Sequence, residues 1–188
     1  MVTIREARLD DIKAIAKVHV DSWVTTYSGI VSAEYLNGLN YKDFEAKWKS
    51  RSLKGVFVAE DEEGSVFGFA SFGPIRSEQS GYDGELYAIY LLEEKQRQGA
   101  GRALLTKGTD FLLDQGFTSM FVWVVEENPS ITFYQSFSPE RAAEDSFEIA
   151  GESMKEIGFG WPDLASLKNC LTEDKNPPSG TAAGGGLD

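Results

Sequence analysis

The feature that most constrains this chain is an apolar segment that leads directly into a glycine-rich turn and a helix. Residues 85–92 (ELYAIYLL) are apolar on both alternating faces, which is typical of a strand at the centre of a sheet. The turn at 98–101 (QGAG) precedes residues 102–114, in which apolar side chains recur with helical spacing. The inner face of this helix is expected to hold Leu104, Leu105, Gly108 and Leu112. A central strand joined to a helix by a tight turn predicts an α/β fold.

Alternating and β-rich segments predict a mixed sheet around that central strand. The further strands are expected at 2–7, 56–60, 66–72, 118–125, 147–150 and 154–161. Residues 61–64 (DEEG) read as the turn of one hairpin, and 151–152 as the turn of another.

Helical spacing accounts for most of the remaining chain. The first helix is expected to start at Asp10 as N-cap and to end near Gly29, with one apolar face made of Ile12, Ile15, His19, Trp23 and Tyr27. Further helices are expected at 32–39, 41–53, 128–136 and, as a short piece, around Leu164, Leu167 and Leu171. Asn128 and Pro129 would be the N-cap and first residue of the helix at 128–136. Residues 172–188 are rich in Pro, Gly, Ser and Ala and predict a flexible tail.

Charge and residue counts exclude several classes of function. The net charge of −12, from 18 basic and 30 acidic residues, opposes nucleic-acid binding and favours a cationic partner such as an amine, although it also serves solubility. With one cysteine, Cys170, and one histidine, His19, we expect no intrachain disulfide and no metal site. We recognise neither a membrane-spanning stretch nor a signal peptide, and we therefore expect a cytoplasmic protein.

The turn that follows the central strand has the properties of an anion site. Its glycines allow close approach of a ligand, and the first amides of the following helix have no intrahelical acceptor. Together with the helix dipole, these amides suit a pyrophosphate, and Arg97 and Arg102 add positive charge. The alternative is a tight strand-to-helix turn without any ligand. The sequence lacks both the Lys-Ser/Thr pair of a Walker A loop and the full Gly-x-Gly-x-x-Gly pattern.

Four segments in order resemble the GCN5-related N-acetyltransferase (GNAT) superfamily over residues 2–161. They are the first strand and helix from Ile4, the Gln96-x-x-Gly99-x-Gly101 turn after its strand, the Asn128 to Tyr134 segment (NPSITFY), and the hairpin of 147–161. The segment 135–141 (QSFSPER) departs from the family, whose members open their next strand with Gly-Phe.

The resemblance implies a fold and a co-substrate. It implies a three-layer α/β (α+β) domain over 1–161, with a mixed, mostly antiparallel sheet of about seven strands, a splayed central strand pair and flanking helices. Residues 162–188 would be a C-terminal extension. The co-substrate would be acetyl-CoA, held by Ile89, Tyr90, Leu91, Gln96, Arg97, Gln98, Gly99, Ala100, Gly101, Arg102 and Asn128.

The resemblance also suggests residues for the chemistry. Glu85 matches the position of a base that removes the amine proton, unless it is solvated at the strand edge or paired with a cation. Tyr134 matches the tyrosine that protonates the departing thiolate, unless it is a core aromatic residue. Trp23 and Tyr27 could contact the acceptor amine or pack in the core, and His19 is expected to be a core residue.

Two functions follow from these residues. The first is acetyl-CoA-dependent N-acetyl transfer, directly to a primary amine of a small molecule or peptide. The second is a non-catalytic acyl-CoA-binding regulatory module, which would need the turn but neither Glu85 nor Tyr134. The acceptor is left open by the sequence, and so is the formation of a homodimer.

Overall fold

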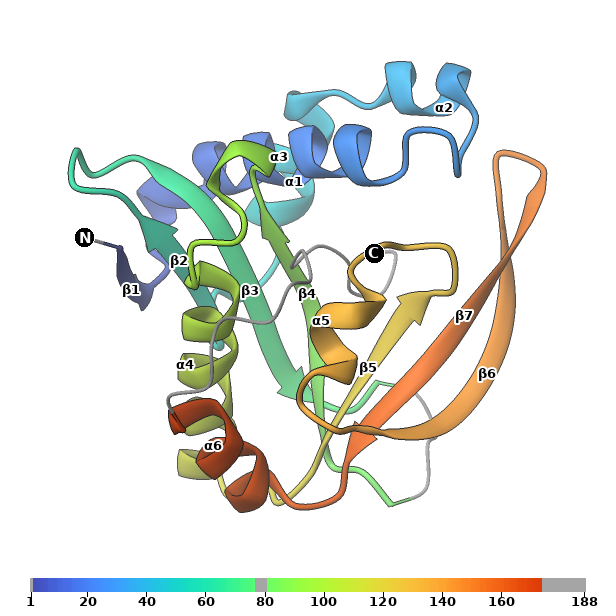
Figure 1. Cartoon of the computed structure of the whole chain (residues 1–188). Helices are drawn as coiled ribbons and strands as arrows, with labels where there is room; N and C mark the ends of the chain where they lie inside the picture. Colours follow the sequence, from blue (N-terminus) through green and yellow to red (C-terminus); the bar gives the residue numbers. More distant parts are fainter. Residues whose placement is uncertain (1, 77–80, 174–188) are drawn as a thin grey trace.

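The computed structural model describes residues 2–76 and 81–173, and its centre is an open seven-stranded sheet (Figure 1). The strand order is β1-β2-β3-β4-β5-β7-β6, and only the β4–β5 pair is parallel. The strands are β1 (Thr3–Glu6), β2 (Val56–Glu60), β3 (Val66–Pro74), β4 (Gly84–Leu91), β5 (Met120–Val125), β6 (Glu140–Ile149) and β7 (Glu152–Trp161). The expectation of a mixed, mostly antiparallel sheet is confirmed.

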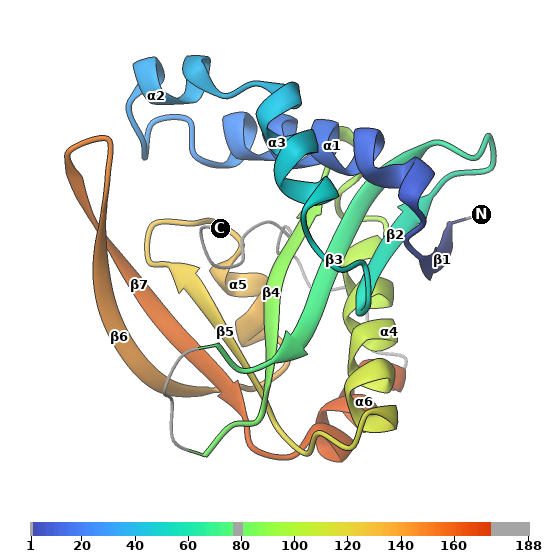
Figure 2. The same cartoon turned by 180° about the vertical axis from the view of Figure 1, so that it is seen from behind.

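Helices cover both faces of the sheet and complete three layers (Figure 2). One face carries α1 (Ile12–Thr26), α2 (Ala33–Gly38) and α3 (Tyr41–Lys49). The other carries α4 (Ala100–Asp114), α5 (Ile131–Gln135) and α6 (Leu164–Thr172). Two short 3-10 turns, η1 (Leu9–Asp11) and η2 (Glu93–Lys95), precede α1 and α4.

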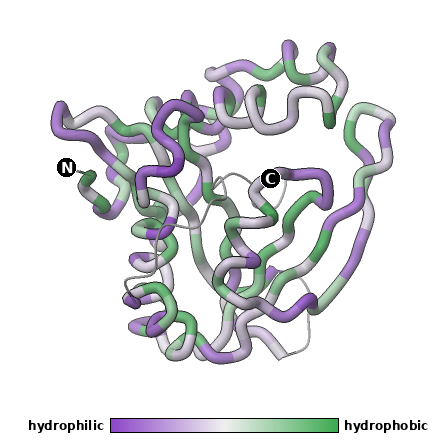
Figure 3. The backbone as a smooth tube through the Cα atoms, in the orientation of Figure 1, coloured by the Kyte–Doolittle hydropathy of each residue, from purple (hydrophilic) through white to green (hydrophobic). Residues whose placement is uncertain are grey.

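Each face of the sheet has its own apolar core because strand side chains alternate between faces. On the α4 side, Leu86, Val122 and Ile157 pack with the predicted inner face of α4. On the α1 side, Tyr90 and Val125 pack with the predicted apolar stripe of α1. The hydropathy-coloured trace places hydrophilic residues on outer turns such as β2–β3 (Figure 3).

The parallel strands β4 and β5 are paired only at their beginning. Gly84 pairs with Met120 and Glu85 with Phe121, and no further pair joins the two strands. The register between β3 and β4 shifts after Ser71, because β4 has one extra residue there. This bulge bends β4. The two strands then diverge, with α5 at the opening (Figure 1). The predicted splayed pair is thus confirmed.

Several predicted boundaries need correction. The first helix begins at Ile12 and not at Asp10, because η1 occupies the preceding residues. The helix predicted from Asn128 begins at Ile131, because the backbone N–H of Ile131 bonds the carbonyl of Asn128 in a tight turn (3.1 Å). Strand β6 begins at Glu140, seven residues before the strand that the sequence predicts at 147–150.

The C-terminal helix α6 forms as predicted and belongs to the core on the α4 side. Leu164, Leu167 and Leu171 are all buried there. The backbone N–H of Leu164 donates to the Thr118 carbonyl (2.8 Å), which fixes the start of α6 beside β5. The flexible tail predicted for 172–188 lies, from residue 174 on, outside the described residues. No helix in the described chain has the length and apolar character needed to cross a membrane.

Candidate functional site

The turn between η2 and α4 exposes backbone donors at the N-terminus of α4. The first intrahelical hydrogen bond runs from the Ala103 N–H to the Gly99 carbonyl (3.0 Å), and no side chain caps this end. The amides of Ala100, Gly101 and Arg102 therefore lack intrahelical acceptors. Gly99 has a φ of +85°, and Arg97 has a φ of +60°, which is rare for a residue with a side chain. Such strain is typical of segments held for a function.

Three of the predicted turn residues use their side chains within the protein. The amide nitrogen of Gln98 donates to the Glu94 carbonyl (3.2 Å). The amide nitrogen of Gln96 donates to the Leu91 carbonyl (3.1 Å) and so ties the turn to the end of β4. The guanidinium of Arg102 donates to the carbonyls of Cys170, Leu171 and Glu173 at 2.9, 2.9 and 2.6 Å, at the end of α6. Positive charge on the exposed side of the turn therefore comes from Arg97.

Strand alternation decides which β4 amides face the gap beside β5. The Leu92 N–H donates to Phe67 of β3 (2.9 Å), so the backbone groups of Leu91 and Ile89 point the other way. The Leu91 carbonyl accordingly accepts bonds from Gln96 and from the Ser22 hydroxyl (3.1 Å). The amide of Tyr90, which the sequence grouped with these two, is directed toward β3.

Three buried tyrosines lie where the splayed strands meet α5 and α1. Tyr27, Tyr90 and Tyr134 are each 0% exposed, and Tyr90 influences the other two electrostatically. Burial, and next the nearby Tyr90, raises the pKa of Tyr134 well above its usual value. Burial likewise raises the pKa of Tyr27. The phenols of Tyr27 and Tyr134 are therefore protonated at neutral pH and can act as hydrogen-bond donors.

Asn128 connects these tyrosines to the end of β5. Its side-chain oxygen accepts from the Ser130 N–H (2.9 Å), which is a capping contact, and its amide nitrogen lies 3.4 Å from the Tyr27 hydroxyl. Its backbone N–H donates to the Val125 carbonyl (3.0 Å). The expected role of Asn128 as helix N-cap needs correction, because the N-cap of α5 is Ser130 and Asn128 caps the turn before it.

Glu85 is buried and paired with a cation. Its carboxylate accepts from the Arg76 backbone N–H (2.7 Å) and from the Arg76 guanidinium (2.8 Å), and its side chain is 3% exposed. This is the ion-paired alternative that the sequence left open. Both carboxylate oxygens of Glu85 are thus engaged by Arg76 through charge-assisted hydrogen bonds.

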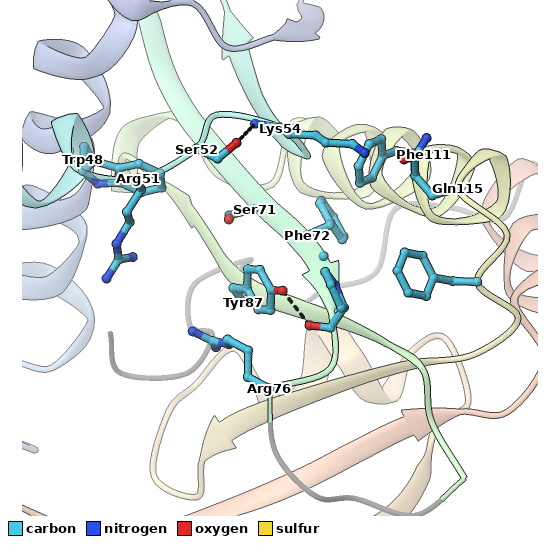
Figure 4. Close-up of a pocket in the computed structure, with 13 residues that line it drawn as sticks. Trp48, Arg51, Ser52, Lys54, Ser71, Phe72, Arg76, Tyr87, Phe111 and Gln115 are labelled. Atoms are coloured by element: carbon cyan, nitrogen blue, oxygen red, sulfur yellow. Dashed lines mark hydrogen bonds between the residues drawn. The ribbon is translucent and has the colours of Figure 1, made fainter.

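A cavity of about 650 Å³ opens beside this ion pair, between the ends of α3 and α4 (Figure 4). Arg51, Lys54 and Arg76 supply three cations, and Tyr87 and Phe111 supply apolar walls. The Arg76 guanidinium lies 4.0 Å from the centre of the Tyr87 ring. Burial, and next the charge of Arg76, lowers the pKa of Arg51, so two cations approach each other here. Within the described chain Arg51 has no carboxylate partner, which suits an anionic group.

The aromatic residues predicted at the acceptor side are in the core. Trp23 and Tyr27 are 4% and 0% exposed, and their rings contact each other at a tilt of 45° with centres 4.6 Å apart. The indole N–H of Trp23 is buried and has no acceptor among residues 2–76 and 81–173. His19 is a core residue as expected, since its Nδ1 accepts from Trp48 (3.3 Å) and burial lowers its pKa to about 3.

The sequence reasoning missed Arg51, Arg76 and Glu156. Glu156 of β7 is half-buried, and burial, followed by the charges of Asp145 and Glu85, raises its pKa to about 7. The sequence contains a pattern that marks Glu156. In a strand, residues two positions apart face the same side, so the charged Glu156 lies on the same face as the apolar Met154. No comparable pattern marks Arg51 or Arg76, which lie in loops.

Comparisons with known proteins agree with this geometry. The family model for the acetyltransferase (GNAT) family matches residues 17–138. An uncharacterised N-acetyltransferase, YuaI of Bacillus subtilis, is 77% identical over 171 residues, which are 91% of this chain and 99% of that protein. The L-amino acid N-acyltransferase MnaT of Escherichia coli is 29% identical over 182 residues, covering 94% of this chain and 98% of MnaT.

A solved structure has the same fold at low sequence identity. The phosphinothricin acetyltransferase of Sinorhizobium meliloti, in complex with acetyl-CoA, superposes with a TM-score of 0.66 at 22% identity, covering 86% of this chain and 88% of that one. The family assignment rests on the match over residues 17–138. The splayed β4–β5 pair and the free amides at the start of α4 agree with it. This chain belongs to the acetyltransferase (GNAT) family.

Proposed function

We propose that this protein is an acetyl-CoA-dependent N-acetyltransferase that moves the acetyl group directly to a primary amine. The observation that carries the proposal is the opening between β4 and β5 directly before the uncapped N-terminus of α4. One strand edge and one helix end thus offer backbone donors along a continuous path. The family match and the acetyl-CoA complex of the S. meliloti relative support the same co-substrate.

The described residues fit the two ends of acetyl-CoA. The amides of Ala100 and Gly101, at the positive end of a 15-residue helix, suit the pyrophosphate, and exposed Arg97 adds charge. The gap-facing backbone of Ile89 and Leu91 suits the amide groups of the pantetheine arm and the thioester carbonyl. Gln98 and Asn128 stay predicted contacts of the same ligand.

The chain's own groups meet two demands of acyl transfer. Backbone donors set in advance stabilise the negative charge that develops on the thioester oxygen. The Tyr134 phenol, protonated because burial raises its pKa, can give a proton to the leaving thiolate. Within the described residues, Glu85 is bound to Arg76, so we do not assign it the third task of removing the amine proton.

The cavity beside Arg76 supports a particular class of acceptor. Arg51 and Arg76 are close enough for repulsion to lower the pKa of Arg51, and a bound carboxylate would relieve that repulsion. An α-amino acid carries both the amine to be acetylated and such a carboxylate. The activity named for MnaT, on L-amino acids, is of the same class. We therefore propose an amino-acid-like acceptor.

Thiol release from acetyl-CoA tests this function. The purified protein should release thiol with L-leucine, and more slowly with spermidine, which lacks a carboxylate, or with an alanine-initiated peptide. Arg51→Gln should raise the KM for L-leucine by about 10-fold or more, since a charge-assisted hydrogen bond is worth roughly 1.5–3 kcal/mol. Tight CoA binding without thiol release above background with any amine would instead favour the non-catalytic acyl-CoA-binding module.

A further inference from the structure

Glu156 lies on the acceptor side of the sheet, in the strand next to the splayed pair. In the strand registers it is opposite Val125 of β5 and Asp145 of β6. Val125, which is opposite Glu156, belongs to the apolar cluster on the α1 side. Ile157, which follows Glu156 in β7, belongs to the cluster on the α4 side. Glu156 therefore projects to the α1 side. Glu85 does so as well, because its neighbour Leu86 is in the cluster on the α4 side.

The position of Glu156 brings it beside the proposed reaction centre. The residue opposite it, Val125, accepts a backbone bond from Asn128, whose side chain reaches the Tyr27 hydroxyl (3.4 Å). Tyr27 in turn is coupled to Tyr90 and Tyr134. One strand therefore separates Glu156 from the tyrosines that line the β4–β5 opening.

The Glu156 side chain has no hydrogen bond or ion pair with any residue that the structure describes. The titratable groups that act on it are the carboxylates Asp145 of β6 and Glu85 of β4, and the β5 residues facing the same side, Phe121, Trp123 and Val125, carry no charge. A half-buried carboxylate among like charges is kept at a cost in stability, which indicates a functional role. Its own environment also favours binding a cation.

The apolar cluster on the α1 side also holds a buried polar group without a hydrogen-bond partner in the described chain. The indole N–H of Trp23, 4% exposed, has no acceptor within the described chain and belongs to the same apolar cluster as Val125. A buried donor without an acceptor costs about 1–3 kcal/mol. An acceptor substrate with a cationic amine and a hydrogen-bond acceptor would satisfy both Glu156 and Trp23.

We propose that Glu156, and not Glu85, receives the proton from the acceptor ammonium. This step rests on the N-acetyltransferase function proposed above. The proton passes from the ammonium nitrogen to a Glu156 oxygen, and the nitrogen lone pair forms the new C–N bond while the thioester C–S bond breaks. The thiolate takes the Tyr134 proton, Tyr134 regains one from the nitrogen as the amide forms, and Glu156 returns its proton to solvent.

The pH dependence of kcat tests the role of Glu156. With the fastest of L-leucine, spermidine and the alanine-initiated peptide, wild-type kcat should fall as the pH drops below about 7, because Glu156 then becomes protonated. Glu156→Gln should lower kcat at pH 8 by about 10²- to 10⁴-fold and remove this acidic limb, with the Kd for CoA unchanged. Retention of both the rate and the limb would overturn the proposal.

Asp145→Asn is the matched variant on the neighbouring strand. Asp145 is exposed and its charge helps to raise the pKa of Glu156, so the substitution should move the acidic limb to lower pH without abolishing turnover. A limb that stays in place in Asp145→Asn would belong to another group. Absence of wild-type turnover with every amine would instead refute the proposed function itself.

Thermal unfolding gives a second readout that needs no substrate. The pKa of Glu156 rises from 4.5 to about 7 on folding, so its ionisation opposes folding increasingly as the pH rises from about 4.5 to 7. Glu156→Gln should therefore raise the Tm at pH 8 and leave it nearly unchanged at pH 4. An equal Tm difference at both pH values would contradict the environment assigned to Glu156.

Discussion

Arg97 holds a left-handed backbone conformation in the turn that is proposed to bind pyrophosphate. A residue with a side chain pays roughly 1–2 kcal/mol for this conformation, and glycine avoids that cost but loses about 0.5–1 kcal/mol through a more flexible unfolded chain. Arg97→Gly should thus raise the free energy of unfolding by about 0.5 kcal/mol in urea denaturation, while it raises the Kd for CoA because a cation is lost.

Ser138 offers a control for this substitution. It also has a positive φ, of 51°, but it lies in the turn before β6. Ser138→Gly should give a similar gain in unfolding free energy without any change in CoA affinity. Loss of CoA affinity in both variants would mean that backbone relief, and not the Arg97 charge, controls binding.

Tyr134 is the proposed donor of the proton that the leaving thiolate takes up. Tyr134→Phe keeps the ring that packs against Phe133 and removes only the hydroxyl. The kcat should fall by about 10- to 10⁴-fold, the range for general acid–base catalysis, with an unchanged Kd for CoA. Tyr41→Phe, which removes a surface hydroxyl bonded to Asp21, should leave kcat unchanged. Equal kcat values for both variants would remove Tyr134 from the mechanism.

At the scale of the elements, α4 is placed by a close contact with β3. A Cβ added at Gly108 would come within 2.0 Å of the Phe72 ring, which is 1% exposed. Alanine gains about 1 kcal/mol in helix propensity, but overpacking costs about 1–3 kcal/mol. Gly108→Ala should therefore lower the unfolding free energy by about 1 kcal/mol, seen as a lower Tm. Lys107→Ala, at the exposed neighbour, should not lower it.

The elements themselves were largely predictable, because hydrophobic period and turn residues act locally. The strand at 85–92, the turn at 98–101 and the inner face of α4 follow directly from spacing. The start of α5 could not be predicted from spacing, because Asn128 and Pro129 suit a tight turn as well as the first residues of a helix. Strand β6 was missed at its beginning because its exposed, charged residues carry no alternation.

At the scale of the whole molecule, contacts between distant segments were not predictable from local pattern. The pairing of Glu85 with Arg76 depends on the β3–β4 register. The approach of Asp145 to Glu156 depends on the β6–β7 register, and that of Glu85 on the strand order β4-β5-β7. The hydrogen bonds of Arg102 to the end of α6 join residues about 70 positions apart. The resemblance alone therefore points to Glu85 as the base, whereas we propose Glu156 from contacts that only the fold reveals, and the loop at 96–102 stays a predicted binding site.

The central claim is that the turn before α4 binds the pyrophosphate of CoA, and calorimetric titration of CoA into two glycine variants tests it. Gly99 and Gly116 flank α4, have φ values of +85° and +88°, and have open space where a Cβ would be added. Valine should strain the backbone similarly at both positions. We predict that Gly99→Val weakens CoA binding by at least about 10-fold whereas Gly116→Val retains wild-type affinity. Equal affinities in the two variants would contradict the account.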